Sequence, residues 1–233
     1  MSFALDSFNF GIVYKYRDTF LNGVLTTIEI ASVCLLLSVF FGIFVALMRM
    51  SKNGLLWRPA AAYIQFIRAT PLLLQIYLVY YGLPALFAFG KHINELQTGL
   101  IALTIHTTPY MAEIIRAGIE SIPRGQFEGA MSVGMTPFQR MFHVVLPQAL
   151  ANVTPPLLGQ TAILIKDTSL LSIIAVTELM SAGLYMFSDS VVATESYLTT
   201  AACYLFIYVL LLLLSHLVRR KCGANWQTRQ GIK

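Results

Sequence analysis

Charged residues are scarce in this chain of 233 residues. They make up 12% of the sequence, against roughly 25% in ordinary soluble domains, while 57% of the residues are hydrophobic. A chain this short needs more polar surface than that to fold in water, and its mean hydropathy of +0.69 agrees. The composition excludes an ordinary soluble domain and predicts a polytopic membrane protein.

Cysteine is scarce as well. The three thiols, at Cys34, Cys203 and Cys222, are too few and too far apart for a disulfide framework or a zinc site. The histidines are isolated and form no metal-binding pattern, so we expect no metal. The basic residues that give a pI near 9.2 are scattered, which argues against a nucleic-acid partner.

Catalytic motifs are missing too. The sequence has no G-x4-G-K-[ST] phosphate loop, so we expect it neither to bind nor to hydrolyse ATP. It has no H-E-x-x-H helix and no G-x-S-x-G turn, which disfavours a membrane protease. We predict no catalytic residues and no bound cofactor. Energy must then come from a partner or from an ion gradient.

Long apolar runs are what the chain does have. A helix needs about 20 mostly apolar residues to cross a bilayer. Because the alternation typical of a membrane barrel is absent, we expect helices and an all-α fold. Five runs qualify, at residues 28–48, 59–89, 96–115, 146–165 and 197–218.

The basic residues set the predicted orientation. Eleven of the 16 lie between the first and second runs, between the third and fourth, or after the fifth. Since basic residues gather on the cytoplasmic side of a membrane, we predict five transmembrane helices with the N-terminus outside and the C-terminus in the cytoplasm.

Two stretches allow a second interpretation. A second span that begins at Leu72 leaves Arg68 at the interface and residues 57–67 along the membrane surface. We favour it because a charge near the bilayer centre costs at least about 3 kcal/mol. The stretch 169–190 is fairly apolar but contains Glu178, and as a sixth span it would oppose the charge bias. We expect a partly buried external or re-entrant loop there.

The third run is polar for a membrane span. It holds Thr104, Thr107 and Thr108, so it should lie inside the bundle or beside a wet cavity. These threonines either hydrogen-bond neighbouring helices or line a solute pathway. Lys166 and Asp167, after the fourth run, either touch the solute or form a local ion pair.

Residues 117–148, on the predicted cytoplasmic side, read as two short helices joined by a turn. Gly134 is a natural helix stop, because glycine takes the left-handed cap without steric cost. Residues 136–139 then have the form of a capping box. We expect Leu146-Pro147 to end the second helix and lead back into the membrane.

An apolar stripe follows the capping box at positions i, i+3, i+4 and i+7: Phe138, Met141, Phe142 and Val145. The stripe either packs against the protein's own spans or docks into a groove on a partner. The sequence pattern alone leaves both open.

The same segment resembles a known motif, the EAA loop of ATP-binding-cassette (ABC) importer permeases, whose pattern is E-A-A-x3-G-x9-I-x-L-P. Gly129 stands for the first alanine and Val144 for the isoleucine. Further stretches, in order and at near-correct spacing, are similar to the polar-amino-acid branch of that family (histidine, glutamine, arginine and glutamate uptake). These stretches are 68–73, 112–119, 121–126, 146–149 and 166–170.

The resemblance covers roughly residues 20–218 and implies the type I ABC importer permease fold. It implies an external segment at 1–19, a permease domain at 20–218 with its coupling loop near 117–148, and a cytoplasmic tail at 219–233. In the family this loop forms coupling helices that sit in a cleft of a cytoplasmic ATPase. The coupling residues carried over are Glu128, Gly129, Ala130, Gly134, Val144, Leu146 and Pro147.

The resemblance also implies the setting of the protein. The expected location is the inner membrane of a bacterium, among lipids. The expected partners are two ATPase subunits, which would hold the ATP and Mg²⁺, a second permease that is identical or related, and an extracytoplasmic solute-binding protein. The implied solute is a polar amino acid. The alternatives are an ABC permease for another small polar solute and an ion-coupled secondary carrier, which usually has internal repeats and more spans.

Overall fold

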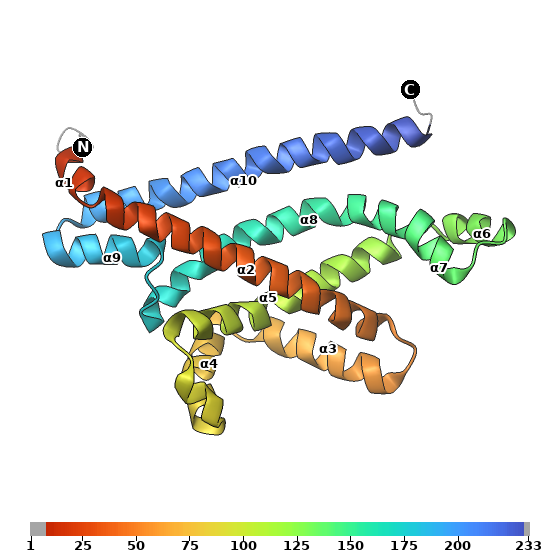
Figure 1. Ribbon diagram of the computed structural model, residues 1–233, viewed down its shortest axis with the longest axis horizontal. Helices are drawn as coiled ribbons and strands as arrows, with labels where there is room; N and C mark the ends of the chain where they lie inside the picture. Colours follow the sequence, from red (N-terminus) through yellow and green to blue (C-terminus); the bar gives the residue numbers. More distant parts are fainter. Residues whose placement is uncertain (1–7, 231–233) are drawn as a thin grey trace. The chain divides into compact units, whose positions relative to one another are not determined.

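The computed structural model describes residues 8–230, with side chains for all of them except 89, 91 and 215–230. Residues 1–7 of the predicted external segment and 231–233 of the predicted tail lie outside this range. Within it every regular element is helical (Figure 1), which confirms the all-α fold. The elements are α1 (Phe10–Lys15), α2 (Arg17–Met50), α3 (Gly54–Ala69), α4 (Leu72–Leu86), η2 (Ala88–His92), α5 (Glu95–Glu120), α6 (Arg124–Ser132), α7 (Pro137–Arg140), η3 (Met141–Val145), α8 (Leu146–Asp167), η4 (Thr168–Ile174), α9 (Leu179–Ser190) and α10 (Ala193–Gln230).

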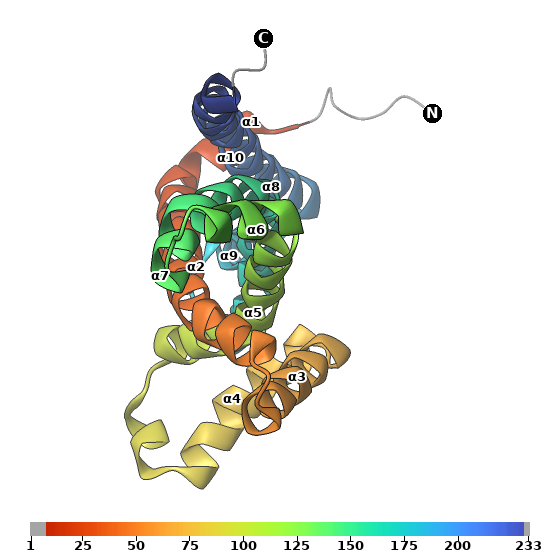
Figure 2. The ribbon, with the colours of Figure 1, turned by 90° about the vertical axis from the view of Figure 1, so that its right-hand side faces the viewer.

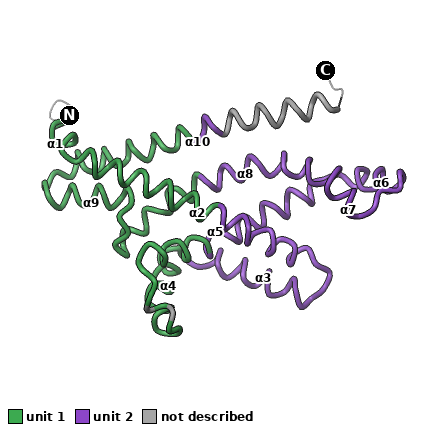
Figure 3. Tube along the Cα trace, viewed as in Figure 1, with its two compact units in different colours: residues 1–35, 71–104, 162–210 green, residues 36–70, 105–161, 211–233 purple. Residues whose placement is uncertain are grey.

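The chain divides into two compact units (Figure 3). The first comprises residues 1–35, 71–104 and 162–210, and the second 36–70, 105–161 and 211–233. Each unit is therefore assembled from segments that lie far apart in the sequence. The predicted coupling loop belongs wholly to the second unit.

Three helical stretches are long and apolar enough to cross a membrane: Arg17–Met50, Pro137–Ile174 and Ala193–Leu214. The consecutive helices α3 and α4 meet the same criterion as a broken pair. The helix over the third predicted span, α5, has 26 residues, but its threonines and charged groups lower its hydropathy. The number of five spans therefore stays a prediction.

The break in the second apolar run lies where the sequence places it. Thr70 leaves the helical region, with φ −110° and ψ 143°, because a following proline disfavours the α conformation. Its hydroxyl donates a 3.0 Å hydrogen bond to the carbonyl of Phe66. Pro71 then caps α4, which begins at Leu72. The predicted helix start at Leu72 is confirmed.

Most of the stretch 169–190 is helical, in η4 and α9, and α9 is not among the helices long and apolar enough to cross a membrane, so the external or re-entrant placement stays a prediction. Glu178 breaks the apolar pattern, yet it starts α9: its carboxylate accepts hydrogen bonds from the N–H groups of Met180 (2.8 Å) and Ser181 (2.9 Å). With 12 residues α9 rises about 18 Å at 1.5 Å per residue. It is too short to cross a hydrocarbon core of about 30 Å.

The helix end predicted at Leu146-Pro147 is wrong. The chain continues from α7 through η3, a π-helical turn, directly into α8. In that turn the N–H of Leu146 bonds to the carbonyl of Met141, five residues back. Pro147 has no N–H to donate, and it lies in the first turn after the π segment, where the ordinary helical bond is not required.

Candidate functional site

The predicted coupling loop forms a helical hairpin made of α6, a tight turn and α7 (Figures 1 and 2). Gly134 closes α6 with φ +77°. The N–H of Met135 bonds to the carbonyl of Ala130 at 3.1 Å, and the N–H of Gly134 bonds to that of Met131 at 3.0 Å. These two bonds make a Schellman cap, which confirms the stop predicted at Gly134.

The second helix of the hairpin starts with the predicted capping box. The N–H of Gln139 donates to the hydroxyl of Thr136 at 3.3 Å, and the N–H of Thr136 donates to the side-chain oxygen of Gln139 at 3.0 Å. Pro137 occupies the first helical turn. Short-range chemistry thus fixes both sides of the turn.

The apolar stripe divides into an exposed and a buried part. The side chains of Phe138 and Phe142 are 68% and 49% exposed, and their ring centroids lie 4.3 Å apart. Val145 is fully buried, in a cluster with Ile122 and Ala149. Packing against the protein's own helices therefore accounts for the end of the stripe, whereas the aromatic pair remains exposed on the hairpin.

The structure places the seven predicted coupling residues on the hairpin, on η3 and at the start of α8: Glu128, Gly129, Ala130, Gly134, Val144, Leu146 and Pro147. Four of them are exposed: Glu128, Gly129, Gly134 and Pro147. Ala130 is buried, and Val144 and Leu146 are half-buried. The hairpin thus presents small residues and a glycine turn on its surface, so another protein can approach its backbone closely.

A cavity of about 690 Å³ lies in the second unit, beside the C-terminal half of α5. Its polar lining includes Arg68, Glu113, Arg116, Asn152 and Gln160. The guanidinium carbon of Arg68 lies 5.7 Å from the ring centroid of Tyr110, which the cavity also contacts. The cavity therefore holds both signs of charge together with amide groups.

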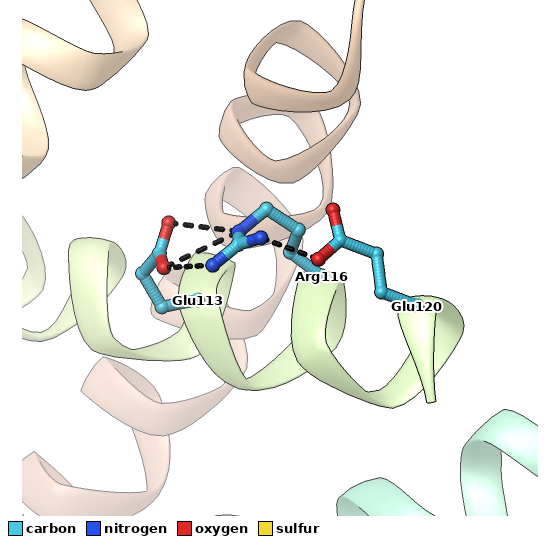
Figure 4. A network of polar contacts seen from close by, with 3 residues as sticks. All are labelled: Glu113, Arg116 and Glu120. Atoms are coloured by element: carbon cyan, nitrogen blue, oxygen red, sulfur yellow. Dashed lines mark hydrogen bonds and ion pairs between the residues drawn. The ribbon is translucent and has the colours of Figure 1, made fainter. Parts of the chain in front are cut away.

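Arg116, which lines this cavity, is paired with two glutamates of its own helix. Arg116 forms ion pairs with Glu113 at 2.7 Å and Glu120 at 2.5 Å, one on each side along α5 (Figure 4). The spacings i, i+3 and i, i+4 place all three side chains on one helix face. The sequence interpretation used Arg116 for the orientation and within the stretch 112–119, and it missed this network, although the spacing was visible.

The predicted pathway residues lie apart from this cavity. Thr104, Thr107 and Thr108 are buried side chains of α5 and do not line it. Lys166 is exposed and lines a second cavity of about 410 Å³, which lies in the first unit. Asp167 is half-buried. Among the described residues no ion pair within 4.0 Å joins Lys166 to Asp167, and the role of these two residues stays a prediction.

A buried carboxylate in the first unit also escaped the sequence interpretation. Glu178 is fully buried, and the hydroxyl of Tyr204 donates a 2.8 Å hydrogen bond to it. The next residue, Leu179, donates its N–H to the hydroxyl of Thr27 at 3.1 Å. This network joins α9 to α10 and α2.

Helices long enough to span a membrane define an integral membrane protein, and its capped hairpin exposes Phe138 and small residues on its surface. Residues 38–222 match the family described as "binding-protein-dependent transport system inner membrane component". The chain belongs to this family, and it is a multi-pass inner-membrane protein. Membership implies ATPase and solute-binding partners and confirms the resemblance drawn from the EAA loop.

Individual relatives agree. The chain is 38% identical to the probable amino-acid ABC transporter permease protein PatM of Vibrio harveyi over 204 residues, which cover 88% of this chain and 92% of that protein. It is 36% identical to the probable glutamine ABC transporter permease protein GlnM of Bacillus subtilis over 201 residues, which cover 86% and 92% of the two chains. A crystal structure of an amino acid ABC transporter with histidines matches with a TM-score of 0.84 at 34% identity and covers 91% of this chain and 98% of the other.

Proposed function

We propose that this chain is the permease subunit of an ATP-driven importer of polar amino acids and supplies one half of the translocation pathway. The observation that carries the proposal is the exposed aromatic pair on a capped hairpin in a member of this transporter family. The similarity to amino-acid and glutamine permeases supports the substrate class.

The hairpin is the contact with the ATPase. Phe138 and Phe142 are the kind of large apolar side chains that anchor protein interfaces. Glu128, Gly129 and Gly134 are exposed on the same hairpin. When the ATPase subunits close on ATP, the hairpin is displaced and the movement passes into α5 and α8. The chain itself is not catalytic and holds no nucleotide, which the missing phosphate loop supports.

The complete transporter contains two permeases, identical or related, two ATPase subunits and an extracytoplasmic binding protein. The hairpin faces the cytoplasm and the N-terminus lies outside, as the distribution of basic residues supports. The five candidate pathway residues are Thr104, Thr107, Thr108, Lys166 and Asp167. Lys166, exposed in a cavity with Thr200 and Tyr204, is the best placed of them to meet a carboxylate.

The test is uptake by right-side-out membrane vesicles that carry the tagged chain with its partners. Labelled glutamine, histidine, arginine and glutamate are offered while an ion gradient is held constant and ATP is removed or restored. The proposal predicts uptake of at least one of these that needs ATP. Uptake that follows the ion gradient without ATP would identify a secondary carrier instead, and ATP-driven uptake of a different polar solute alone would overturn the substrate class.

A further inference from the structure

The hairpin is attached to the rest of the second unit through two irregular stretches of backbone. Residues 121–123 form a non-helical turn between α5 and α6. On the other side, η3 (Met141–Val145) is a π-helical turn between α7 and α8. Irregular turns of this kind are common hinge points. A displacement of the hairpin would bend at both places unless something braces them.

Two side-chain amides of α8 form such braces. The amide of Asn152 donates a 2.8 Å hydrogen bond to the hydroxyl of Ser121, which in turn donates to the carbonyl of Gly118 at 2.8 Å. The amide of Gln148 donates to the side-chain oxygen of Gln126 at 3.2 Å and to the carbonyl of Val144 at 2.8 Å.

The two braces have a simple geometry. Gln148 and Asn152 are four residues apart on α8 and therefore lie on the same face. Asn152 reaches Ser121, the first residue of the turn after α5, and Gln148 reaches Gln126 of α6 after the turn. Gln148 also bonds within the π turn, so the two amides together bridge both irregular stretches.

The backbones of α5 and α8 also lie close together near these hydrogen bonds. A Cβ added to Gly118 would lie 2.4 Å from Cγ2 of Val153 and 3.4 Å from the carbonyl oxygen of Ala149. Ile122, Val145 and Ala149, each of which follows a hydrogen-bonded residue in the sequence, form a buried cluster. Phe127 of α6 packs against this cluster. The end of α5, α6 and the start of α8 are therefore held by apolar packing as well as by the amides.

We infer that Asn152 and Gln148 are positioning residues for energy coupling: they make the hairpin, the end of α5 and the start of α8 move as one lever. The inference rests on the proposed function. Both hydrogen bonds lie at exposed or half-exposed groups, where an ordinary bond adds little to overall stability. Their role is to transmit motion. Without these hydrogen bonds, the two turns would bend and absorb the displacement that ATP binding imposes on the hairpin.

The test uses the complete transporter in proteoliposomes and measures solute molecules imported per ATP hydrolysed. Asn152→Leu and Gln148→Met remove the amides with similar volume, and Ser121→Ala removes the partner of Asn152. Thr154→Val is the matched control, since its hydroxyl bonds to Leu150 within α8 itself. Each brace variant should lower the transport-to-hydrolysis ratio by roughly fivefold, the factor that one ordinary hydrogen bond represents, whereas the control should not.

Two further readouts separate a transmission role from a structural one. The ATPase should still co-purify with each brace variant, and the Asn152→Leu, Ser121→Ala double variant should be no worse than either single change. An unchanged ratio in Ser121→Ala and Gln148→Met overturns the inference, even if Asn152→Leu proves unstable. Loss of the ATPase from all brace variants also overturns it, because the residues would then serve docking. If wild-type vesicles show no ATP-driven uptake, the proposed function itself fails.

Discussion

The backbone N–H of Met135 donates a 3.1 Å hydrogen bond to the carbonyl of Ala130, across a residue that lies in the left-handed region of the backbone map. That residue is Gly134, at φ +77°. The bond reverses the chain between α6 and α7 and sets the direction in which Phe138 and Phe142 leave the turn. The shape of the hairpin therefore depends on one glycine.

Replacing this glycine by a side-chain residue should uncouple transport. Gly134→Leu places a branched side chain in a conformation that costs an L-residue about 1–2 kcal/mol, so ATP-driven uptake should fall about tenfold while membrane insertion is kept. Gly125→Ala is the matched control, because Gly125 lies in helical backbone of α6 with no atoms within 4 Å of a new Cβ. Normal uptake by Gly134→Leu would contradict the account.

The aromatic pair should carry the binding of the ATPase. Phe138→Ser removes an exposed anchor, and the loss of a hot-spot aromatic typically weakens an interface by about 2 kcal/mol or more, roughly thirtyfold. Pull-down of the purified ATPase on the detergent-solubilised permease measures this affinity. Leu55→Ser, at another highly exposed apolar position away from the hairpin, should leave the affinity unchanged. If both variants bind the ATPase with equal affinity, the aromatic pair does not belong to the interface.

The buried carboxylate of Glu178 should be needed for stability. Tyr204→Phe deletes one of its hydrogen-bond donors and leaves a buried charge less satisfied, at a cost of about 1–3 kcal/mol. Glu178→Ala should cost more, since α9 also loses its N-cap. Thermal unfolding in detergent measures both, with Tyr208→Phe at an exposed position as the control. A Tyr204→Phe midpoint equal to that of the control would show that the network is dispensable.

The N-terminal helix should detach only at high pH. The hydroxyl of Tyr16 donates to Asp189, which raises the pKa of Tyr16 above its usual value of 10.0. The pKa of Lys15 is also raised, first by its 3.4 Å hydrogen bond to Tyr16 and then by the attraction of Asp189. Since the folded-state pKa values exceed the unfolded ones, these contacts act fully below about pH 10 and are lost as the pH rises beyond it.

A spin label at position 10, in a variant without other cysteines, reports on this helix. Its mobility should stay constant from pH 6 to pH 9 and increase above about pH 10, and Tyr16→Phe should remove the tyrosine contribution to that increase. A transition near neutral pH would show that other groups hold the helix.

The parts of the fold that the sequence predicts correctly are those set by neighbouring residues. The start of α4 at Leu72 follows from Pro71, and the hairpin turn follows from Gly134 and the Thr136 capping box, all within a few positions. Glu178 could not be interpreted in this way. Its carboxylate is satisfied in part by Tyr204, and its helix is held by Thr27, 152 residues from Leu179.

The helix through Pro147 shows a second kind of limit. A proline predicts a helix end because it lacks an N–H, but here the helix continues through Pro147 directly after a π turn, in which the N–H of Leu146 bonds to the carbonyl of Met141. The cavity beside α5 is a third case, because Arg68 and Asn152 meet there from separate helices. Spacing along one helix predicts pairs such as Arg116 with Glu113, but it does not predict which helices come together.

The most direct test of the central claim is to purify the C-terminally tagged chain from its native membranes in mild detergent and to identify the proteins that accompany it by mass spectrometry. The account predicts an ATPase with a phosphate loop, present with wild type and with Gly125→Ala and depleted with Phe138→Ser. Recovery of the chain alone, or only as a pair of permeases, in several detergents would contradict the assignment of the hairpin as the coupling element.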